Sequence, residues 1–164
     1  MPPSCRAAAP GHPRKGAKRH GPDNPDGVPQ SLFDGFTQAA QADTPAWMKG
    51  FLDSYYNIDT LRGTLVSEQA YQASFNIAVS ASAAATVACI STWLTDFRAD
   101  LANIDVPMLV IDGNADRVLP YDKTGARLPG LIKDIRLVTI EGGPHAIAWT
   151  HTDQVNQALL DFLG

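Results

Sequence analysis

The sequence predicts an α/β fold in which a helical region precedes a β-α-β-α unit with two parallel strands. Three observations lead to this prediction. Apolar residues recur at helical spacing from residue 29 to about residue 100. A short, almost wholly apolar run follows at 106–111, with the composition of a strand buried on both faces, and we expect a second buried strand at 135–140. A helical pattern follows each run, and such short alternating units form parallel sheets.

The helical region is expected to contain four helices. They begin near Ser31, Asp43, Ser67 and Ala83, and the fourth runs to about Phe97. Aspartate and serine are favoured at helix N-caps, which places three of these starts. Aromatic residues recur here at helical spacing. Core packing is the simpler interpretation of that spacing, and a ligand-lining role is the alternative.

The β-α-β-α unit is expected to continue to the end of the sequence. After the first strand, which ends at Asp112-Gly113, we expect a helix over about 123–133. After the second strand, the glycines and proline at 142–144 end the extended run. The last helix is predicted to begin near Thr150, because Thr150 and Asp153 have the spacing of a capping box.

Residues 1–22 differ from the rest in composition. Seven of the twelve prolines lie in the first 29 residues, and residues 1–22 carry five of the thirteen bases and no acid. With almost nothing apolar to bury, this segment is expected to be a disordered basic tail. The domain prediction is therefore a tail at 1–22, a helical lid at 23–103 and a β-α-β-α core part at 104–164.

Composition also bears on class and compartment. No residue between Glu68 and Asp96 is charged, but glutamine, asparagine, serine and threonine interrupt this stretch, so we expect a buried helix rather than a membrane span. The two cysteines, Cys5 and Cys89, favour a reducing compartment, and we expect a cytoplasmic protein. The net charge of −4 argues against a nucleic-acid partner.

Two side chains follow the two predicted strands at the point where each ends. Asp116 lies just after the first strand and His145 just after the second. Parallel strands about 4.8 Å apart end at the same edge, so a carboxylate can there fix the tautomer of an imidazole and leave its other nitrogen free as a base. The alternatives are that Asp116 caps the next helix and that His145 is an ordinary loop residue. His145 and His151 are six apart, unlike the i,i+4 pair of a metal-binding helix, so we expect no metal site. No Gly-rich phosphate loop is present, and we expect no cofactor.

The amino-acid sequences of both strand-and-loop segments resemble the C-terminal end of the α/β-hydrolase fold. These segments are IDVPMLVIDGNADRVLP and RLVTIEGGPHAIAWTHTDQVNQALLDFL. The helical block from DNPDGVPQSLFDGF to STWLTDFRADL is similar to the lid of such hydrolases. Within the fold, the sequence looks like the cofactor-free (non-heme) chloroperoxidase and aryl-esterase branch. The resemblance implies that Asp116 is the triad acid and His145 the triad base. It also implies small ester or carboxylic-acid substrates, which intact relatives hydrolyse or, with peroxide, convert to peracids.

The sequence departs from that family at the nucleophile. These enzymes carry a serine on a Gly-x-Ser-x-Gly elbow ahead of the acid and the histidine, and no serine here has that setting. There is no glycine at all between Gly63 and Gly113. We therefore expect a truncated α/β-hydrolase fold, a fragment holding the lid and the last two strands, with a frameshift or a misjudged start as one explanation.

Without a nucleophile, we expect no hydrolysis by this chain alone. The first alternative is a non-catalytic protein-interaction module, and the second is a half-enzyme completed in trans by another chain. A two-stranded parallel sheet leaves the outer edge of its first strand unpaired, which predicts self-association or a partner chain at that edge.

Overall fold

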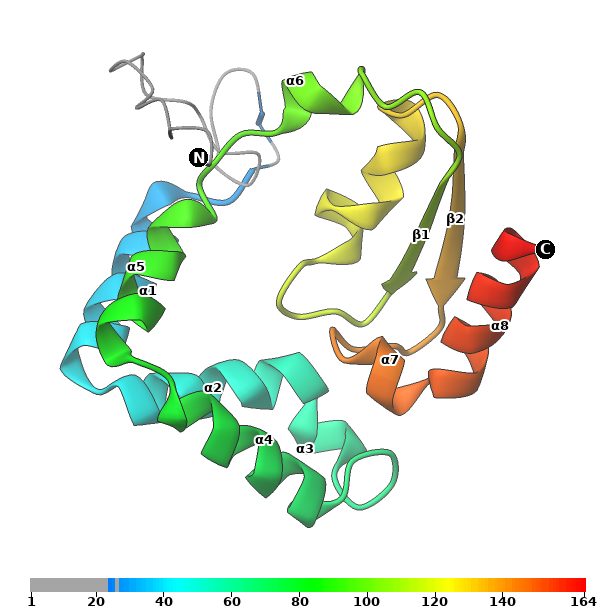
Figure 1. Ribbon diagram of the computed structural model, residues 1–164. Helices are drawn as coiled ribbons and strands as arrows, with labels where there is room; N and C mark the ends of the chain where they lie inside the picture. The colour runs from blue at the N-terminus through cyan, green and yellow to red at the C-terminus, as the bar shows by residue number, and fades with distance from the viewer. Residues whose placement is uncertain (1–23, 26) are drawn as a thin grey trace, which may run out of the picture.

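The structure is a computed structural model, and it describes residues 24–25 and 27–164. The helices α1, α2, α4 and α5 lie together on one side of the chain, and the two strands lie on the other with the C-terminal helix (Figure 1). The predicted tail at 1–22 lies outside the described residues. The division of the remaining chain near residue 103 stays a prediction.

Four longer helices form the first part, and three of their predicted starts are confirmed. Asp43 accepts a hydrogen bond from the backbone N–H of Ala46, and Ser67 accepts one from Ala70, as N-cap side chains do. The first helix instead follows Pro29 and has no side-chain cap bond. The bounds are α1 (Gln30–Ala42), α2 (Thr44–Tyr56), α4 (Glu68–Ser80) and α5 (Ala83–Thr92).

The fourth helix was expected to reach Phe97, and that expectation is wrong. Helix α5 ends at Thr92, and the Asp96 side chain accepts from the backbone N–H of Arg98 at 3.0 Å and from its guanidinium at 2.7 Å. This local pairing starts a separate short helix, α6 (Arg98–Leu101). Two further helices of four residues, α3 (Ile58–Leu61) and α7 (Ile147–Thr150), were not predicted, because four residues are too few to show a period.

Helices α2 and α4 are joined by polar contacts as well as by packing. The hydroxyl of Tyr71 donates to Asp53 at 2.6 Å, and Lys49 Nζ lies 2.8 Å from the other carboxylate oxygen. Burial alone would raise the pKa of Asp53, but these hydrogen bonds lower it below its usual value.

The two predicted strands are present and parallel. Strand β1 (Met108–Gly113) pairs with β2 (Ile135–Ile140), with Met108 opposite Ile135 and Gly113 opposite Ile140. The second strand has the predicted bounds. The first begins two residues after the apolar run does, because Pro107 has no N–H to donate to a ladder.

The connection between the strands is helical, but the predicted α-helix at 123–133 is wrong. The chain forms two 3₁₀ helices instead, η1 (Tyr121–Lys123) and η2 (Gly125–Gly130). Pro129 cannot donate an intrahelical hydrogen bond, and glycine at both ends of η2 has the lowest helix propensity apart from proline.

The last helix, α8 (Thr152–Leu163), begins later than predicted. Thr150 belongs to α7, where its hydroxyl bonds the carbonyl of Ala146 at 3.1 Å and lies 2.8 Å from His151 Nδ1. It therefore does not form the predicted capping box with Asp153. The N-cap of α8 is His151, which makes no side-chain cap bond to the helix.

The main buried cluster joins the helical part to the second strand's loop. Ala146, which follows β2, packs with five residues of the helical part: Leu52, Tyr56, Ile58, Val66 and Tyr71. This contact places α2 and α3 beside the loops that leave the sheet (Figure 1).

No single helix among the described residues is both long and apolar enough to cross a bilayer. Helices α4 and α5 reach that length and apolar composition only together, and they are bent by 93° at their junction.

Candidate active site

The acid loop follows β1 and is organised around Asp116. One carboxylate oxygen, Oδ1, accepts from the backbone N–H of Val118 at 2.7 Å and of Leu119 at 2.8 Å. The side chain is 4% exposed. Asp116 therefore closes the turn that follows it. It does not cap the next helix, as one alternative expected, because η1 has Pro120 as its N-cap and no side-chain cap bond. The second carboxylate oxygen of Asp116 remains available for another donor.

The histidine loop follows β2 and approaches the acid loop closely. The backbone N–H of Ala115 donates to the carbonyl of Gly143 at 3.0 Å. A Cβ on Gly113 would clash with that same carbonyl, so this crossing requires glycine at the end of β1. Pro144, which is fully buried, then directs the chain toward His145.

The loops are tied together a second time by Asn114. Its side-chain amide donates to Glu141 at 2.7 Å, and its Oδ1 accepts from the backbone N–H of Gly142 at 2.8 Å. The backbone N–H of Asn114 donates to the carbonyl of Ile140 at 3.1 Å. Because these bonds link both ends of the crossing, the backbones that carry Asp116 and His145 are held relative to each other.

The two loops bring Asp116 and His145 into contact. Asp116 Oδ2 lies 2.7 Å from His145 Nδ1, the length of a charge-assisted hydrogen bond. Since an ionised carboxylate can only accept, Nδ1 carries the proton and Nε2 has a free lone pair. The imidazole is 29% exposed. The arrangement can accept a proton at Nε2 and stabilise the resulting imidazolium through the buried carboxylate.

The helical part also reaches this pair. The ring of Tyr55, at the end of α2, lies edge-to-face against the imidazole with 5.1 Å between ring centroids, and its carbonyl accepts from the N–H of Ala146 at 3.1 Å. Burial raises the pKa of Tyr55, and the nearby Tyr56 and Asp116 raise it further. Asn57 donates from its side-chain amide to the carbonyl of Ala115 at 2.8 Å. Sequence reasoning missed both contributions, that of Tyr55 in α2 and that of Asn57 directly after it.

Asp112 is the other carboxylate near the strand ends. It lies on β1 itself, and its side chain packs against Gly125, where a Cβ would clash with the carboxylate. Burial raises the pKa of Asp112, and repulsion from Asp116 raises it further, against hydrogen bonds from the backbone of Gly113 and Gly125. No hydrogen bond joins Asp112 to the imidazole, whereas Asp116 Oδ2 lies 2.7 Å from His145 Nδ1.

Within the described part of the chain, no serine hydroxyl bonds to His145. Ser74, for example, pairs with the hydroxyl of Tyr56 at 2.8 Å, on the α4 side. The same residues contain no group of three or more His, Cys, Asp or Glu side chains placed to hold a metal ion.

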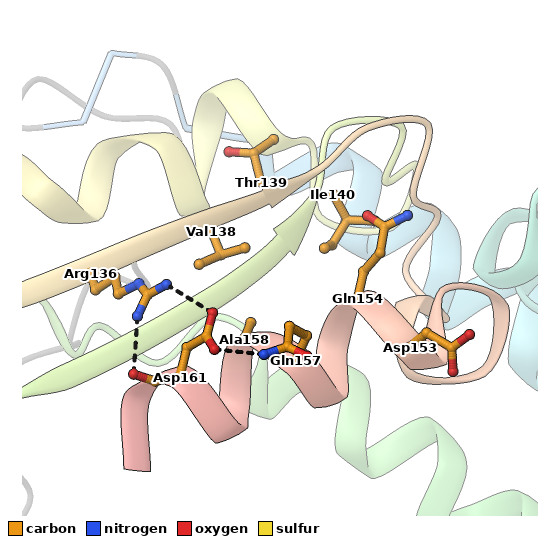
Figure 2. Close-up of a pocket in the computed structure, with 9 residues that line it drawn as sticks. All are labelled: Arg136, Val138, Thr139, Ile140, Asp153, Gln154, Gln157, Ala158 and Asp161. Carbon is orange, nitrogen blue, oxygen red and sulfur yellow. Dashed lines mark hydrogen bonds and ion pairs between the residues drawn. The ribbon is translucent and has the colours of Figure 1, made fainter. Parts of the chain in front are cut away.

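A shallow depression of about 500 Å³ lies between β2 and α8, and neither Asp116 nor His145 is among the residues that line it (Figure 2). Three of the side chains that line it are joined: Arg136 lies 3.7 Å from Asp161 Oδ2, and Gln157 donates to Asp161 at 2.6 Å. Figure 2 shows Arg136 on β2 reaching Asp161 on α8, where Asp161 also contacts Gln157.

Known proteins resemble this chain in sequence and in structure. It is 55% identical over 141 residues to a protein of Synechocystis sp. named "Putative non-heme chloroperoxidase", covering 86% of this chain and 51% of that protein. It is 31% identical over 143 residues to the non-heme chloroperoxidase CPO-A1 of Kitasatospora aureofaciens, covering 85% and 52%. The crystal structure of a bromoperoxidase from Bacillus anthracis matches with a TM-score of 0.81 and 31% identity, over 88% of this chain and 52% of that one.

The chain spans about half the length of the curated relatives that it matches. No family model matches the sequence.

Proposed function

Because this chain belongs to the α/β-hydrolase fold family, in the branch of the non-heme chloroperoxidases, we propose that it carries the acid–base half of a Ser–His–Asp acyl-transfer site. Asp116 is the orienting acid and His145 is the general base. The observation that carries the proposal is the 2.7 Å contact between Asp116 Oδ2 and His145 Nδ1.

The proposed chemistry follows from the position of the protons. With Nδ1–H held by the carboxylate, Nε2 removes the proton of a serine hydroxyl as that oxygen attacks an ester carbonyl. The imidazolium then returns the proton to the leaving alcohol. Asp116 stays ionised throughout and stabilises the imidazolium. A water molecule, or hydrogen peroxide, repeats the same step on the acyl-enzyme.

The serine of this site is proposed to lie on a segment outside this sequence. Removing one triad member leaves only a residual ~10³–10⁴-fold rate enhancement, which comes from the oxyanion hole and binding, and both depend on the missing segment. We therefore expect the chain alone to hydrolyse esters no faster than its His145→Ala variant does.

Two surfaces support completion by another segment. The described sheet has only β1 and β2, so the outer edge of β1 carries unpaired backbone groups. Helix α8 exposes apolar side chains, Leu160 at 65% and Leu163 at 78%. An added segment that pairs with β1 and covers α8 would bury both and could bring the nucleophile to His145.

A chimera tests the proposal. The 141 matched residues of the Synechocystis relative are replaced by their counterparts from this chain, and p-nitrophenyl acetate turnover is compared with that of the unaltered relative. We expect turnover in the chimera, and a loss of about 10³-fold or more on His145→Ala, as for loss of a triad base. The matched control is His151→Ala, which removes a histidine that bonds Thr150 instead.

Two results would contradict the proposal. One is a folded chimera whose turnover survives His145→Ala. The other is equal loss from His151→Ala, which would show that the effect does not come from this imidazole.

A further inference from the structure

We propose that residues 55–59 form a positioning element that holds the acid loop and the histidine loop together, with Asn57 as its central positioning residue. This segment joins the end of α2 to the start of α3. The inference rests on the proposed role of Asp116 and His145 as an acid–base pair, and it adds residues that act on that pair without touching a substrate.

The segment contacts the acid loop on both sides of Asp116. Asn57 Nδ2 donates to the carbonyl of Ala115 at 2.8 Å, and Asp59 pairs with the guanidinium of Arg117 at 2.7 Å. The carboxylate of Asp116 therefore lies between two residues that are both tied to the same short stretch of chain. Rotation of the acid loop about its own backbone would break one of these contacts.

The same segment contacts the histidine loop. The carbonyl of Tyr55 accepts from the N–H of Ala146, and the ring of Tyr55 packs on the imidazole of His145. The hydrogen bond fixes the backbone just after the histidine, and the ring limits its side-chain rotation. One stretch of five residues thus contacts both partners of the 2.7 Å bond.

The backbone of Asn57 explains how five residues can reach both loops. Asn57 has φ 49° and ψ 52°, and it is the only non-glycine residue with positive φ in the described chain. This left-handed conformation ends α2 and starts α3 within one residue, and asparagine tolerates it better than most side chains. Because Asn57 is 3% exposed, its amide is held inside the junction.

The loop-to-loop bonds do not replace this element. The bonds of Asn114 and the one from Ala115 to Gly143 join the beginning of the acid loop to the beginning of the histidine loop. They lie before Asp116 and before His145. Asp59 and Tyr55 contact the residues after them, Arg117 and Ala146, so that both loops are held on both sides of the reacting groups. Asn57 adds a bond to the carbonyl of Ala115, directly before Asp116.

The test uses the full chain labelled with ¹⁵N in its histidines, with His145 assigned by His145→Gln. In the wild type we expect a pyrrole-type Nδ1 and a pyridine-type Nε2, with the Nδ1 proton protected from exchange by Asp116. The variant Asn57→Gly removes the amide and keeps the left-handed backbone, since glycine adopts positive φ readily. We expect mixed tautomers and an Nδ1 proton that exchanges about five- to tenfold faster, the factor that corresponds to one lost hydrogen bond.

A second pair of variants provides the control. Asp59→Asn breaks the pair with Arg117, whose side chains are 61% and 46% exposed, and should give a smaller change in the same direction. Asp161→Asn breaks the similarly exposed pair with Arg136 in the depression shown in Figure 2, and should leave His145 unchanged. In the chimera, Asn57→Gly should lower kcat about tenfold with KM unchanged, because misplaced reacting groups slow the chemical step.

The outcomes separate the two proposals. If Asn57→Gly lowers the unfolding midpoint but leaves the tautomer and the exchange rate of His145 as in the wild type, Asn57 is only structural and the inference is overturned. If the wild type itself shows a proton on Nε2 instead of Nδ1, the acid–base pair is wrong and both proposals fail. If Asn57→Gly does not fold, Asp59→Asn is compared with Asp161→Asn by the tautomer of His145 and the exchange rate of its Nδ1 proton. A change in Asp59→Asn alone supports the inference, and no difference between the two variants overturns it.

Discussion

Replacing Asp116 by asparagine and by alanine separates the two tasks of this carboxylate. Asp116 caps a turn through Oδ1 and orients His145 through Oδ2. Asparagine can keep the first task, because its carbonyl oxygen still accepts from Val118 and Leu119. It cannot keep the second, because its amide group would donate where a carboxylate accepts. Alanine loses both.

The expected costs follow from the three hydrogen bonds. A bond to a charged group contributes about 1.5–3 kcal/mol and a neutral one about 0.5–1.5 kcal/mol. Asparagine makes the retained bonds neutral but also relieves the desolvation of a buried charge, so we expect the free energy of unfolding to fall by about 1–2 kcal/mol. Alanine leaves the backbone donors and the imidazole without their acceptor, and we expect a loss of about 3–5 kcal/mol.

Urea denaturation followed by circular dichroism measures both losses, and histidine ¹⁵N spectra report the tautomer. In Asp116→Asn the imidazole should move its proton from Nδ1 to Nε2, which removes the free base. Asp122→Asn, an exposed carboxylate in η1, is the matched control and should change stability by less than about 0.5 kcal/mol. Equal losses for the asparagine and alanine variants would refute the capping role, and an unchanged tautomer in Asp116→Asn would refute the orienting role.

Three further predictions concern packing and pH. Gly113→Ala should lower the free energy of unfolding, measured in urea, by about 1–3 kcal/mol, because the new methyl group would clash with the histidine loop at Gly143. In the control Gly130→Ala, the new methyl group would have no neighbouring atom within 4 Å, so no clash is expected. The folded pKa of Asp53 is lowered from 3.8, so the ionised carboxylate stabilises the fold above pH 3.8, and this stabilisation is lost as the pH falls through the folded pKa. Asp53→Asn should therefore flatten the acid side of a curve of unfolding free energy against pH. Asp112 has the opposite shift, so its contribution is lost as the pH rises through its raised folded pKa, and Asp112→Asn should raise the urea midpoint at pH 7. An Asp112→Asn midpoint below the wild-type value would show that its backbone hydrogen bonds outweigh burial.

The sequence was sufficient to predict the acid–histidine contact because the signal for it is topological. Two apolar runs predicted parallel strands, and parallel strands end at one edge, so side chains just beyond their ends approach each other. The structure places Asp116 and His145 in contact although they are 29 positions apart. The helix between the strands was mispredicted, but a 3₁₀ connection returns the chain to the same edge as an α-helix would.

The positioning element could not be predicted in the same way. Asn57 at the end of an apolar helical pattern is an ordinary termination signal, and its sequence neighbours do not show which carbonyl its amide will reach. That carbonyl, at Ala115, lies 58 positions later, and the contact exists because Ala146 packs into a cluster with residues of α2 and α3. Such long-range placement depends on how the helical part docks on the strand-end loops, which periodicity does not encode.

The groups that hold the acid–histidine pair all belong to this chain. All of these contacts lie within the described residues: the hydrogen bonds that Asp116 accepts from Val118 and Leu119, the close approach at Gly113, the bonds of Asn114 and the contacts from residues 55–59. The orientation of His145 should therefore be present before any nucleophile is supplied, and a segment that pairs with β1 would meet an imidazole already in its basic tautomer. A tautomer that appears only in the chimera, and not in the chain alone, would contradict this order and would assign the orientation to the added segment.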